Sequence, residues 1–357
     1  MYYRFLLLVL LLLLYLPVHG EHKAIFKFDS VYHVSGKSYC NKLRVIDMRE
    51  NKNMLGRLKT GHFNRTADIV SEQPLPDMLA QHFDKMITAN DKGNEELLLV
   101  LYSLEMEDRP NKEEIGIFHF DGDFFRGKGG QYTFAGRVDS LYEVGDKWDV
   151  SKKLIQDAQI TIAKLLARFA VMNVDAHGQT SYSEAKALSR RTDKKMSYAI
   201  YNATAYKKGI YHTVEQFLNN QPVDTPFLIS KFDADNGIEK TVYVRYIDKD
   251  GNKSPLVNAG KFFAIYFDKV WYVNAKTYMA EMVNKNGDFY AVFKYLGIPK
   301  KTNTAKDAPL GVETSEVRAL IGADIVIVPG DTNNGMRYYH SKFEPDYNRF
   351  LPLKLHY

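Results

Sequence analysis

The run Leu97–Leu104 constrains the fold more than any other part of the sequence. It reads Leu-Leu-Leu-Val-Leu-Tyr-Ser-Leu, so an extended chain would present apolar side chains on both of its faces. A strand of this kind needs cover on both sides, which is typical of a strand in the middle of a sheet. We therefore expect residues 97–104 to form a central strand, with residues 43–47 as an earlier strand of the same unit.

Two amphipathic helices are expected around this strand. The first opens at Pro74 and Pro76, and the second begins at Asp149-Val150-Ser151, where Asp149 or Ser151 can cap the free N–H groups. Each helix carries one apolar face at helical spacing. The face of the first consists of Leu79, Phe83, Met86 and Ile87, and that of the second of Leu154, Ala158, Ile162, Leu165 and Phe169.

The segment from Ile115 to Phe125 has two interpretations. Asp121-Gly122 lies between apolar runs and is typical of a two-residue hairpin turn, which is the interpretation we favour. In the alternative, the chain continues as a strand and places His119, Asp121 and Asp123 on one face, where they could bind a metal ion. Residues 127–130 are expected to form a glycine-rich loop, and Tyr132 to Val144 a further strand.

The predicted fold class is α+β, with an N-terminal helix-covered sheet and a β-rich C-terminal domain. The helix-covered sheet spans 21–173, a polar basic linker 174–205, the β-rich domain 206–299 and a C-terminal extension 300–357. The linker contains five basic residues between Lys186 and Lys195. We expect a solvated segment there, with contact to anionic lipid, glycan phosphate or nucleic acid as alternatives.

The β-rich domain is divided by polar turns. A short helix is expected at 213–219, and strands at 227–232, 241–247, 261–267, 270–273 and 289–296. Asp268-Lys269 is the expected turn between the third and fourth of these strands, and Asp248 to Asn252 closes the second. In the extension, the apolar run at 324–328 predicts one more strand.

The N-terminus has the layout of a signal peptide over residues 1–20. Arg4 precedes an apolar run at 5–16, Pro17 ends that run, and Val18-His19-Gly20 precedes the expected first mature residue, Glu21. An uncleaved anchor is the alternative. No later stretch approaches 18 apolar residues, so no transmembrane segment is expected after cleavage. The net charge of +5 becomes +4 when the leader, with its single Arg, is removed.

Cysteine usage favours a bacterial envelope over a eukaryotic secretory route. Cys40 is the only cysteine, so no internal disulfide can form, and it lies too far from Glu21 to be a lipidated first residue. We expect the protein in the periplasm or at the outer envelope surface. Nothing around Cys40 supplies a base, so an idle buried thiol is expected rather than a nucleophile.

No catalytic or cofactor motif emerges from the residues. Gly-x-Ser-x-Gly, Walker, His-Glu-x-x-His and Cys-x-x-Cys patterns are all missing from the sequence. Asp233–Gly237 and Asp248–Asn252 fail the spacing of a calcium loop and are expected to form β-turns. Asp175 and His177 could form an acid/base pair, but we favour the interpretation that they are two polar side chains at the protein surface. The catalytic residues therefore stay unknown, and no cofactor or metal is expected.

Two segments resemble known groups of proteins. Lys208 to Pro222, KGIYHTVEQFLNNQP, resembles a KGIYxTxxEFxxNxP segment of secreted Bacteroidetes proteins of unknown function. The following hairpin, Phe267 to Val273, resembles theirs but has no Gly after Asp268. Val45 to Arg49, Gly56 and the later order of elements are weakly similar to periplasmic auxiliary lipoproteins of bacterial ABC transporters. The resemblances imply a compartment and a lineage, and no activity.

The function favoured by these observations is non-enzymatic. We expect an exported cell-envelope protein that binds or assembles with an envelope protein or glycan, with 24 Tyr and 21 Phe available for strand surfaces or for the core. The alternative is an exported hydrolase that acts on polysaccharide or peptide through side chains from separate loops. A lipid-associated transport accessory is a third, weaker interpretation. Nucleic acid is not an expected partner.

Overall fold

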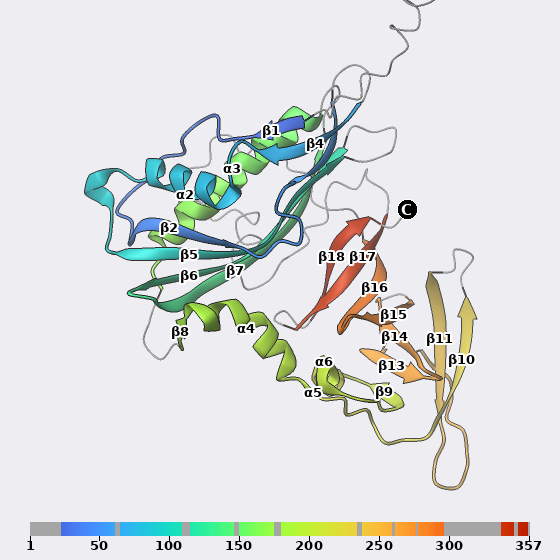
Figure 1. Ribbon diagram of the computed structural model, residues 1–357. Coiled ribbons are helices and arrows are strands. Elements are labelled where there is room, and N and C mark those ends of the chain that lie inside the picture. The colour runs from blue at the N-terminus through green and yellow to red at the C-terminus, as the bar shows by residue number, and fades with distance from the viewer. Residues whose placement is uncertain are drawn as a thin grey trace, which may run out of the picture.

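The computed structural model is an α+β protein built on two β-sheets (Figure 1). It describes residues 23–60, 65–108, 115–145, 150–174, 180–233, 238–258, 261–275, 278–295, 337–345 and 349–355. The expected signal peptide, Asp175 and His177, residues 234–237 and the strand expected at 324–328 lie outside these ranges. Among the described residues, no helix combines the length and apolar character that a membrane span requires.

The first sheet has eight strands in the order β1-β4-β3-β5-β6-β7-β8, and β2 also pairs with β5. Its strands are β1 (Lys23–Phe26), β2 (Cys40–Asp47), β3 (Gly56–Thr60), β4 (Arg65–Ser71), β5 (Glu95–Asp108), β6 (Ile115–Lys128), β7 (Gln131–Gly145) and β8 (Ser181–Ser183). β5 is central, as its sequence predicts: β2 and β3 pair with one of its edges in parallel, and β6 pairs with the other in antiparallel.

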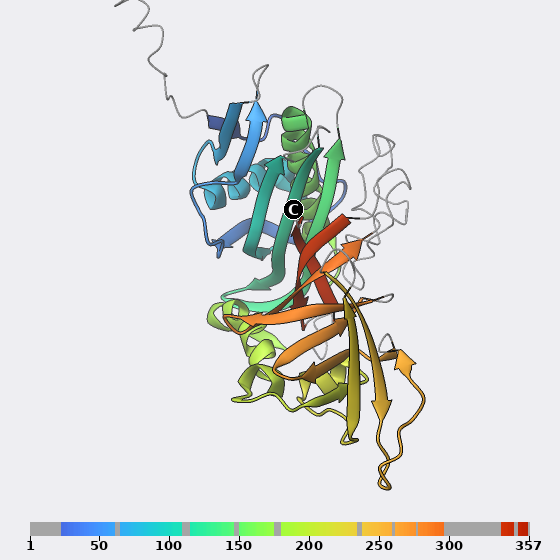
Figure 2. The same ribbon diagram turned by 90° about the vertical axis from the view of Figure 1, so that its right-hand side faces the viewer.

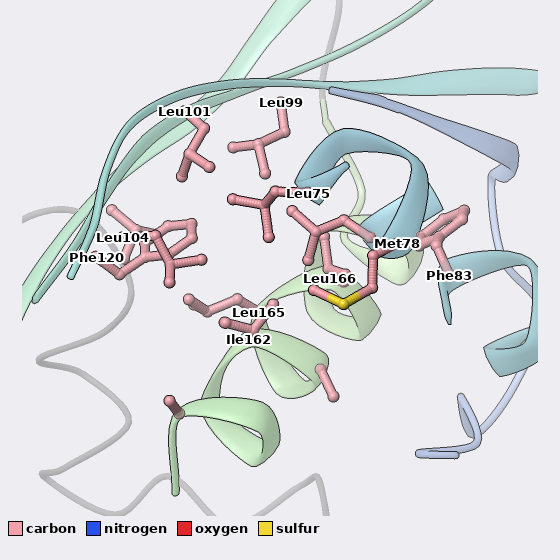
Figure 3. Close-up of a cluster of buried hydrophobic side chains, with 14 of the residues drawn as sticks. Leu75, Met78, Phe83, Leu99, Leu101, Leu104, Phe120, Ile162, Leu165 and Leu166 are labelled. Carbon is pink, nitrogen blue, oxygen red and sulfur yellow. The ribbon is translucent and has the colours of Figure 1, made fainter. Parts of the chain in front are cut away.

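Two helices cover one face of this sheet, α2 (Leu75–Met86) and α3 (Val150–Val171), as their apolar stripes predict (Figure 1). Figure 3 shows side chains of both helices converging on those of the sheet. The labelled residues are buried and comprise Leu75, Met78 and Phe83 of α2, Ile162, Leu165 and Leu166 of α3, and Leu99, Leu101, Leu104 and Phe120 of the sheet. This layer is the main hydrophobic core.

The prediction of a hairpin turn at Asp121-Gly122 is wrong. β6 runs unbroken from Ile115 to Lys128 and pairs with β7 along its whole length. Gly122 serves packing instead, because a Cβ at that position would lie 2.8 Å from a methyl group of Leu99. The chain turns at Gly129 and Gly130, which both have positive φ and lie in the segment expected to be a loop.

The second sheet has ten strands in antiparallel pairs, seven of them in the order β18-β17-β16-β15-β14-β13-β9 (Figures 1 and 2). Strand β11 pairs with β10, β12 and β15. The strands are β9 (Gly209–Tyr211), β10 (Phe227–Asp233), β11 (Glu239–Tyr246), β12 (Val257–Asn258), β13 (Ala264–Phe267), β14 (Val270–Asn274), β15 (Met279–Lys285), β16 (Asp288–Tyr295), β17 (Arg337–Glu344) and β18 (Arg349–Leu355).

Local turn chemistry in this sheet agrees with the sequence. Asp268 and Lys269 join β13 to β14 and both have positive φ, 53° and 62°, as a two-residue hairpin turn requires. Asp248 accepts hydrogen bonds from the backbone N–H groups of Asp250 and Asn252, which closes the expected turn. The short helix α6 (Val214–Leu218) follows Thr213, whose hydroxyl accepts a hydrogen bond from the N–H of Gln216.

The segment expected to be a solvated linker contains ordered elements. Residues 181–202 form β8, α4 (Glu184–Met196) and α5 (Ala199–Asn202). Elsewhere in the chain, a short 3-10 helix, η1 (Ala89–Asp91), precedes β5. Helix α4 lies on the face of the first sheet that is opposite to α2 and α3 (Figure 1). Arg190 and Arg191 of α4 bind buried carboxylates of that sheet, so the expectation of a solvated segment is wrong for these two side chains.

Candidate functional site

The most unusual concentration of charge lies where the first sheet, α4 and β17 meet. Asp121 and Asp123 extend from alternate positions of β6, so both lie on the same face of the strand. That face is the one that α2 and α3 leave uncovered. The structure thus confirms the shared face of the alternative sequence interpretation, and it pairs both carboxylates with arginines.

Two consecutive arginines of α4 bind these carboxylates. Asp123 is fully buried, and Arg190 donates to its Oδ2 from Nε at 3.1 Å and from Nη2 at 2.9 Å. Arg191 donates to Oδ1 of Asp123 at 2.6 Å and to both oxygens of Asp121 at 2.6 and 2.8 Å. Guanidinium groups suit such sites because their fixed fork of donors matches a carboxylate.

Arg137 of β7 extends the contacts to the second sheet. It donates to Asp121 at 3.3 Å, to Asp139 at 3.2 Å and to Glu344 of β17 at 2.9 Å. Glu344 also binds Lys342 of the same strand, and Lys342 binds Asp288 of β16. In both pairs the lysine Nζ lies 3.4 Å from a carboxylate oxygen. Lys195 of α4 then binds Asp288 at 2.6 Å. The ion pairs therefore form a continuous chain that begins and ends on α4.

This set of contacts, which we call the ion-pair chain, balances its charges. Its members are five carboxylates (Asp121, Asp123, Asp139, Asp288 and Glu344) and five cations (Arg137, Arg190, Arg191, Lys195 and Lys342). Balance matters here because most members are largely removed from water, and an unpaired buried charge would be strongly unfavourable. The ion-pair chain joins the two sheets and α4.

The protonation states follow from this pairing. Burial opposes ionisation of Asp121, but the Arg191 and Arg137 guanidinium groups outweigh that effect and hold the pKa of its carboxyl well below the usual range. Burial likewise disfavours the charged form of Arg191, yet Asp121 and Asp123 raise its pKa above the ordinary value. Asp121 and Arg191 are therefore charged at neutral pH.

Aromatic rings flank the arginines. The guanidinium of Arg191 lies 3.7 Å from the ring centroid of Tyr102, and that of Arg190 lies 4.1 Å from the centroid of Phe134. The Tyr102 hydroxyl is buried without a hydrogen-bond partner in the described part of the chain. Burial, with Asp123 nearby, raises the pKa of Tyr102 to about 12, so it stays neutral.

A hydrogen-bonded Ser–His–Asp series lies beside the ion-pair chain. His119 contacts Ser103 Oγ through Nδ1 at 3.0 Å and Asp139 Oδ1 through Nε2 at 3.2 Å. The three residues come from neighbouring strands, β5, β6 and β7, and a register shift at Leu101–Ser103 helps to place Ser103. Sequence reasoning missed this group because its members are 16 and 20 residues apart and share no local motif.

Other residues singled out in the sequence have local roles. Arg49 binds both carboxylate oxygens of Asp47 and donates to the carbonyls of Lys52 and Met54, so the Asp-x-Arg motif closes the segment between β2 and β3. Gly127 packs against the backbone of Gln131. Among the described residues, no group of three or more His, Cys, Asp or Glu side chains could hold a metal ion.

Cys40 should be unreactive while the protein is folded. The thiol is buried, and its burial raises the pKa to about 12, so almost no thiolate exists at pH 8. We expect a maleimide reagent to modify Cys40 at pH 8 at least about a hundredfold more slowly in buffer than in denaturant. Mass spectrometry of the labelled chain measures this, and equal rates in the two solvents would contradict it.

Comparison with known proteins yields little. No family model and no curated protein matches the sequence. Among solved structures, protein XCC0632 from Xanthomonas campestris, described under the family model DUF330, has a TM-score of 0.28 and 9% identity over 42% of this chain and 94% of its own. A second, titled only as an uncharacterized protein, has a TM-score of 0.26 and 10% identity over 42% of this chain and 97% of its own.

Proposed function

We propose that this chain is a non-enzymatic, exported protein of the bacterial cell envelope that binds or assembles with an envelope partner. The observation that carries the proposal is the ion-pair chain. It uses the most concentrated set of charged side chains in the described structure to hold two sheets and α4 together. Groups that are saturated by each other in this way do not reach a substrate, whereas a fixed arrangement of two sheets suits a surface that recognises a partner.

Energetic considerations support the same conclusion. Buried ion pairs add little net stability compared with apolar packing of the same volume, but their directional bonds can specify one arrangement over others. Here the bonds specify the placement of α4 and of β17 on the first sheet. The signal-peptide layout and the resemblance of 208–222 to secreted Bacteroidetes proteins support export.

Gentle crosslinking in the native host tests the proposal. A tagged full-length chain should enrich one dominant envelope component over a tagged, unrelated exported protein. The matched variant is Arg137→Met, which breaks the contact with Glu344 but leaves the bonds of α4 to Asp123 in place. If it folds, as circular dichroism would show, it should capture less of that component. A solitary wild-type protein would contradict the proposal.

A hydrolase is the second candidate, and Ser103, His119 and Asp139 are the observation that favours it. A hydroxyl, an imidazole and a carboxylate in hydrogen-bonded series are the groups that acyl transfer uses. Ser103, however, bonds to Nδ1, and Asp139 to Nε2, which reverses the usual use of the ring nitrogens. Asp139 is also bound by Arg137. We therefore rank this function below binding or assembly.

Covalent labelling separates the two functions. A fluorophosphonate probe modifies an activated serine and leaves other serines intact. The hydrolase function predicts labelling of the wild-type protein that is lost in Ser103→Ala and retained in Ser181→Ala, which replaces an exposed serine of β8. The binding function predicts no labelling of any of the three proteins.

A further inference from the structure

His119 is placed to link a proton to the contact between the two sheets. Its side chain is only 12% exposed, and both ring nitrogens are engaged, one by Ser103 and one by Asp139. Asp139 is shared, because Arg137 binds its other oxygen. Arg137 in turn holds Glu344 of β17. A change of charge on the imidazole therefore acts on Arg137, a residue of the first sheet that binds the second.

The surroundings of His119 are acidic on several sides. From β5, Glu105 is its direct cross-strand partner, and Ser103 faces it on the same strand. From β6 and β7 come Asp121 and Asp139, with the cation Arg137 beside them. Arg191 of α4 and Glu344 of β17 reach the same cluster through Asp121 and Arg137. Asp139, Asp121 and Glu105 each favour the charged imidazole.

We propose that His119 is a proton-operated latch between the two sheets: on taking up a proton it binds Asp139 as a cation and shifts Arg137 towards Asp121 and Glu344. The covalent structure is unchanged, and only one proton moves, from solvent to Nδ1. Ser103 Oγ, which donates to Nδ1 of the neutral ring, then accepts from Nδ1–H. The contact between β7 and β17 is tighter in the protonated state.

The direction of the pH effect follows from the surroundings. Burial disfavours the cation, but the hydrogen bond to Asp139 and the charges of Asp139, Asp121 and Glu105 prevail and raise the pKa of His119 above its ordinary 6.5. A base with a raised pKa in the folded state contributes stability that is complete below its pKa in the unfolded chain. That stability is lost as the pH rises through the folded-state pKa.

One other buried histidine acts in the opposite direction. His82 of α2 stacks on Phe28, and burial lowers its pKa to about 4. The fold therefore favours neutral His82, whose contribution is complete above pH 6.5 and decreases as the pH falls towards 4. At pH 6.5 His82 is neutral in the folded protein but half protonated in the unfolded chain, which favours unfolding by about twofold. Comparing wild type with His119→Gln removes this contribution, because both proteins keep His82.

Urea unfolding of the full-length protein at pH 6.5 and 8.5 is the first test. Wild type should be less stable at pH 8.5 than at pH 6.5. The factor by which its unfolding equilibrium constant rises between these pH values should exceed the factor for His119→Gln by about threefold or more. His33→Gln replaces an exposed histidine outside the cluster and should retain the wild-type difference. An undiminished difference in His119→Gln would overturn the latch.

Hydrogen exchange of the β17 amides tests whether protonation of His119 in the first sheet stabilises β17 in the second. After correction for the intrinsic rate, the amides of β17 should be about threefold or more better protected at pH 6.5 than at pH 8.5. In Glu344→Gln this difference should vanish, while the difference in global unfolding remains. Should His119→Gln fail to fold, Glu344→Gln carries the test alone, and β17 protection that still follows pH in that variant would overturn the proposal.

Discussion

Replacing Asp123 with alanine is expected to lower the free energy of unfolding by about 3–5 kcal/mol, a large share of what holds a protein of this kind together. The carboxylate is fully buried on β6 and receives charge-assisted hydrogen bonds from Arg190 and Arg191 at 2.6–3.1 Å. Its removal leaves Arg190 and Arg191, in the middle of α4, with an excess of positive charge. Urea unfolding monitored by circular dichroism measures the loss.

An exposed ion pair offers the matched control. Asp68 binds Arg57 at 2.9 Å, but the two side chains are 43% and 65% exposed, so water and salt screen the interaction. Asp68→Ala should therefore cost about 1 kcal/mol or less. If Asp123→Ala cost no more than Asp68→Ala, the ion-pair chain would not fix α4 on the sheet, and the basis of the proposed function would fail with it.

Phe124→Ala is expected to lower the free energy of unfolding by about 3–5 kcal/mol through a different mechanism. Phe124 is the neighbour of Asp123 on β6 but points to the opposite face, where its ring stacks on Phe169 of α3 with the centroids 3.9 Å apart. Truncation removes buried apolar surface and leaves a cavity between the sheet and the helix. Thermal and urea unfolding both measure the loss.

Two further substitutions identify the cause of that loss. Phe124→Leu keeps most of the apolar volume and should cost clearly less than Phe124→Ala. Val283→Ala truncates a side chain of β15 that is 52% exposed, and it should change the free energy of unfolding by about 0.5 kcal/mol or less. Equal losses for Phe124→Ala and Val283→Ala would show that α3 does not pack on β6 as described.

Elements whose causes are local could be predicted from the sequence. The stripes of α2 and α3 and the two-faced apolar run in β5 each depend on residues within a few positions of one another. The two-residue turn at Asp268-Lys269 belongs to the same group, because hairpin geometry depends on the two turn residues themselves. For these segments, tertiary packing reinforces the preference that the residues already have.

The hairpin expected at Asp121-Gly122 shows where such reasoning ends. Asp and Gly are good turn formers, but here Gly makes room for Leu99, and Asp binds an arginine 70 residues further along the chain. Neither partner can be identified from the residues around position 121. For the same reason Arg190 and Arg191 indicate a solvated basic segment when α4 is considered alone.

The candidate site was accessible to sequence reasoning only in part. The alternation of His119, Asp121 and Asp123 does predict a common face, and the structure confirms it. What the spacing cannot reveal is that the neighbouring strand β7 supplies Arg137 and Asp139 on the same face, or that β17 supplies Glu344. Carboxylates that bind a metal ion and carboxylates that bind arginines both need to lie on one face of a strand. Only the tertiary arrangement therefore distinguishes the two kinds of site.

The sequence separation along the ion-pair chain has a consequence for how the protein is made. Arg190 and Arg191 follow Asp123 by 67 and 68 residues, whereas Glu344 follows Arg137 by 207. During synthesis from the N-terminus, α4 is therefore available to neutralise the charged face of the first sheet long before β17 exists. In a half-made chain, Asp121 and Asp123 would therefore already be paired with α4, whereas Arg137 would still lack its contact with Glu344.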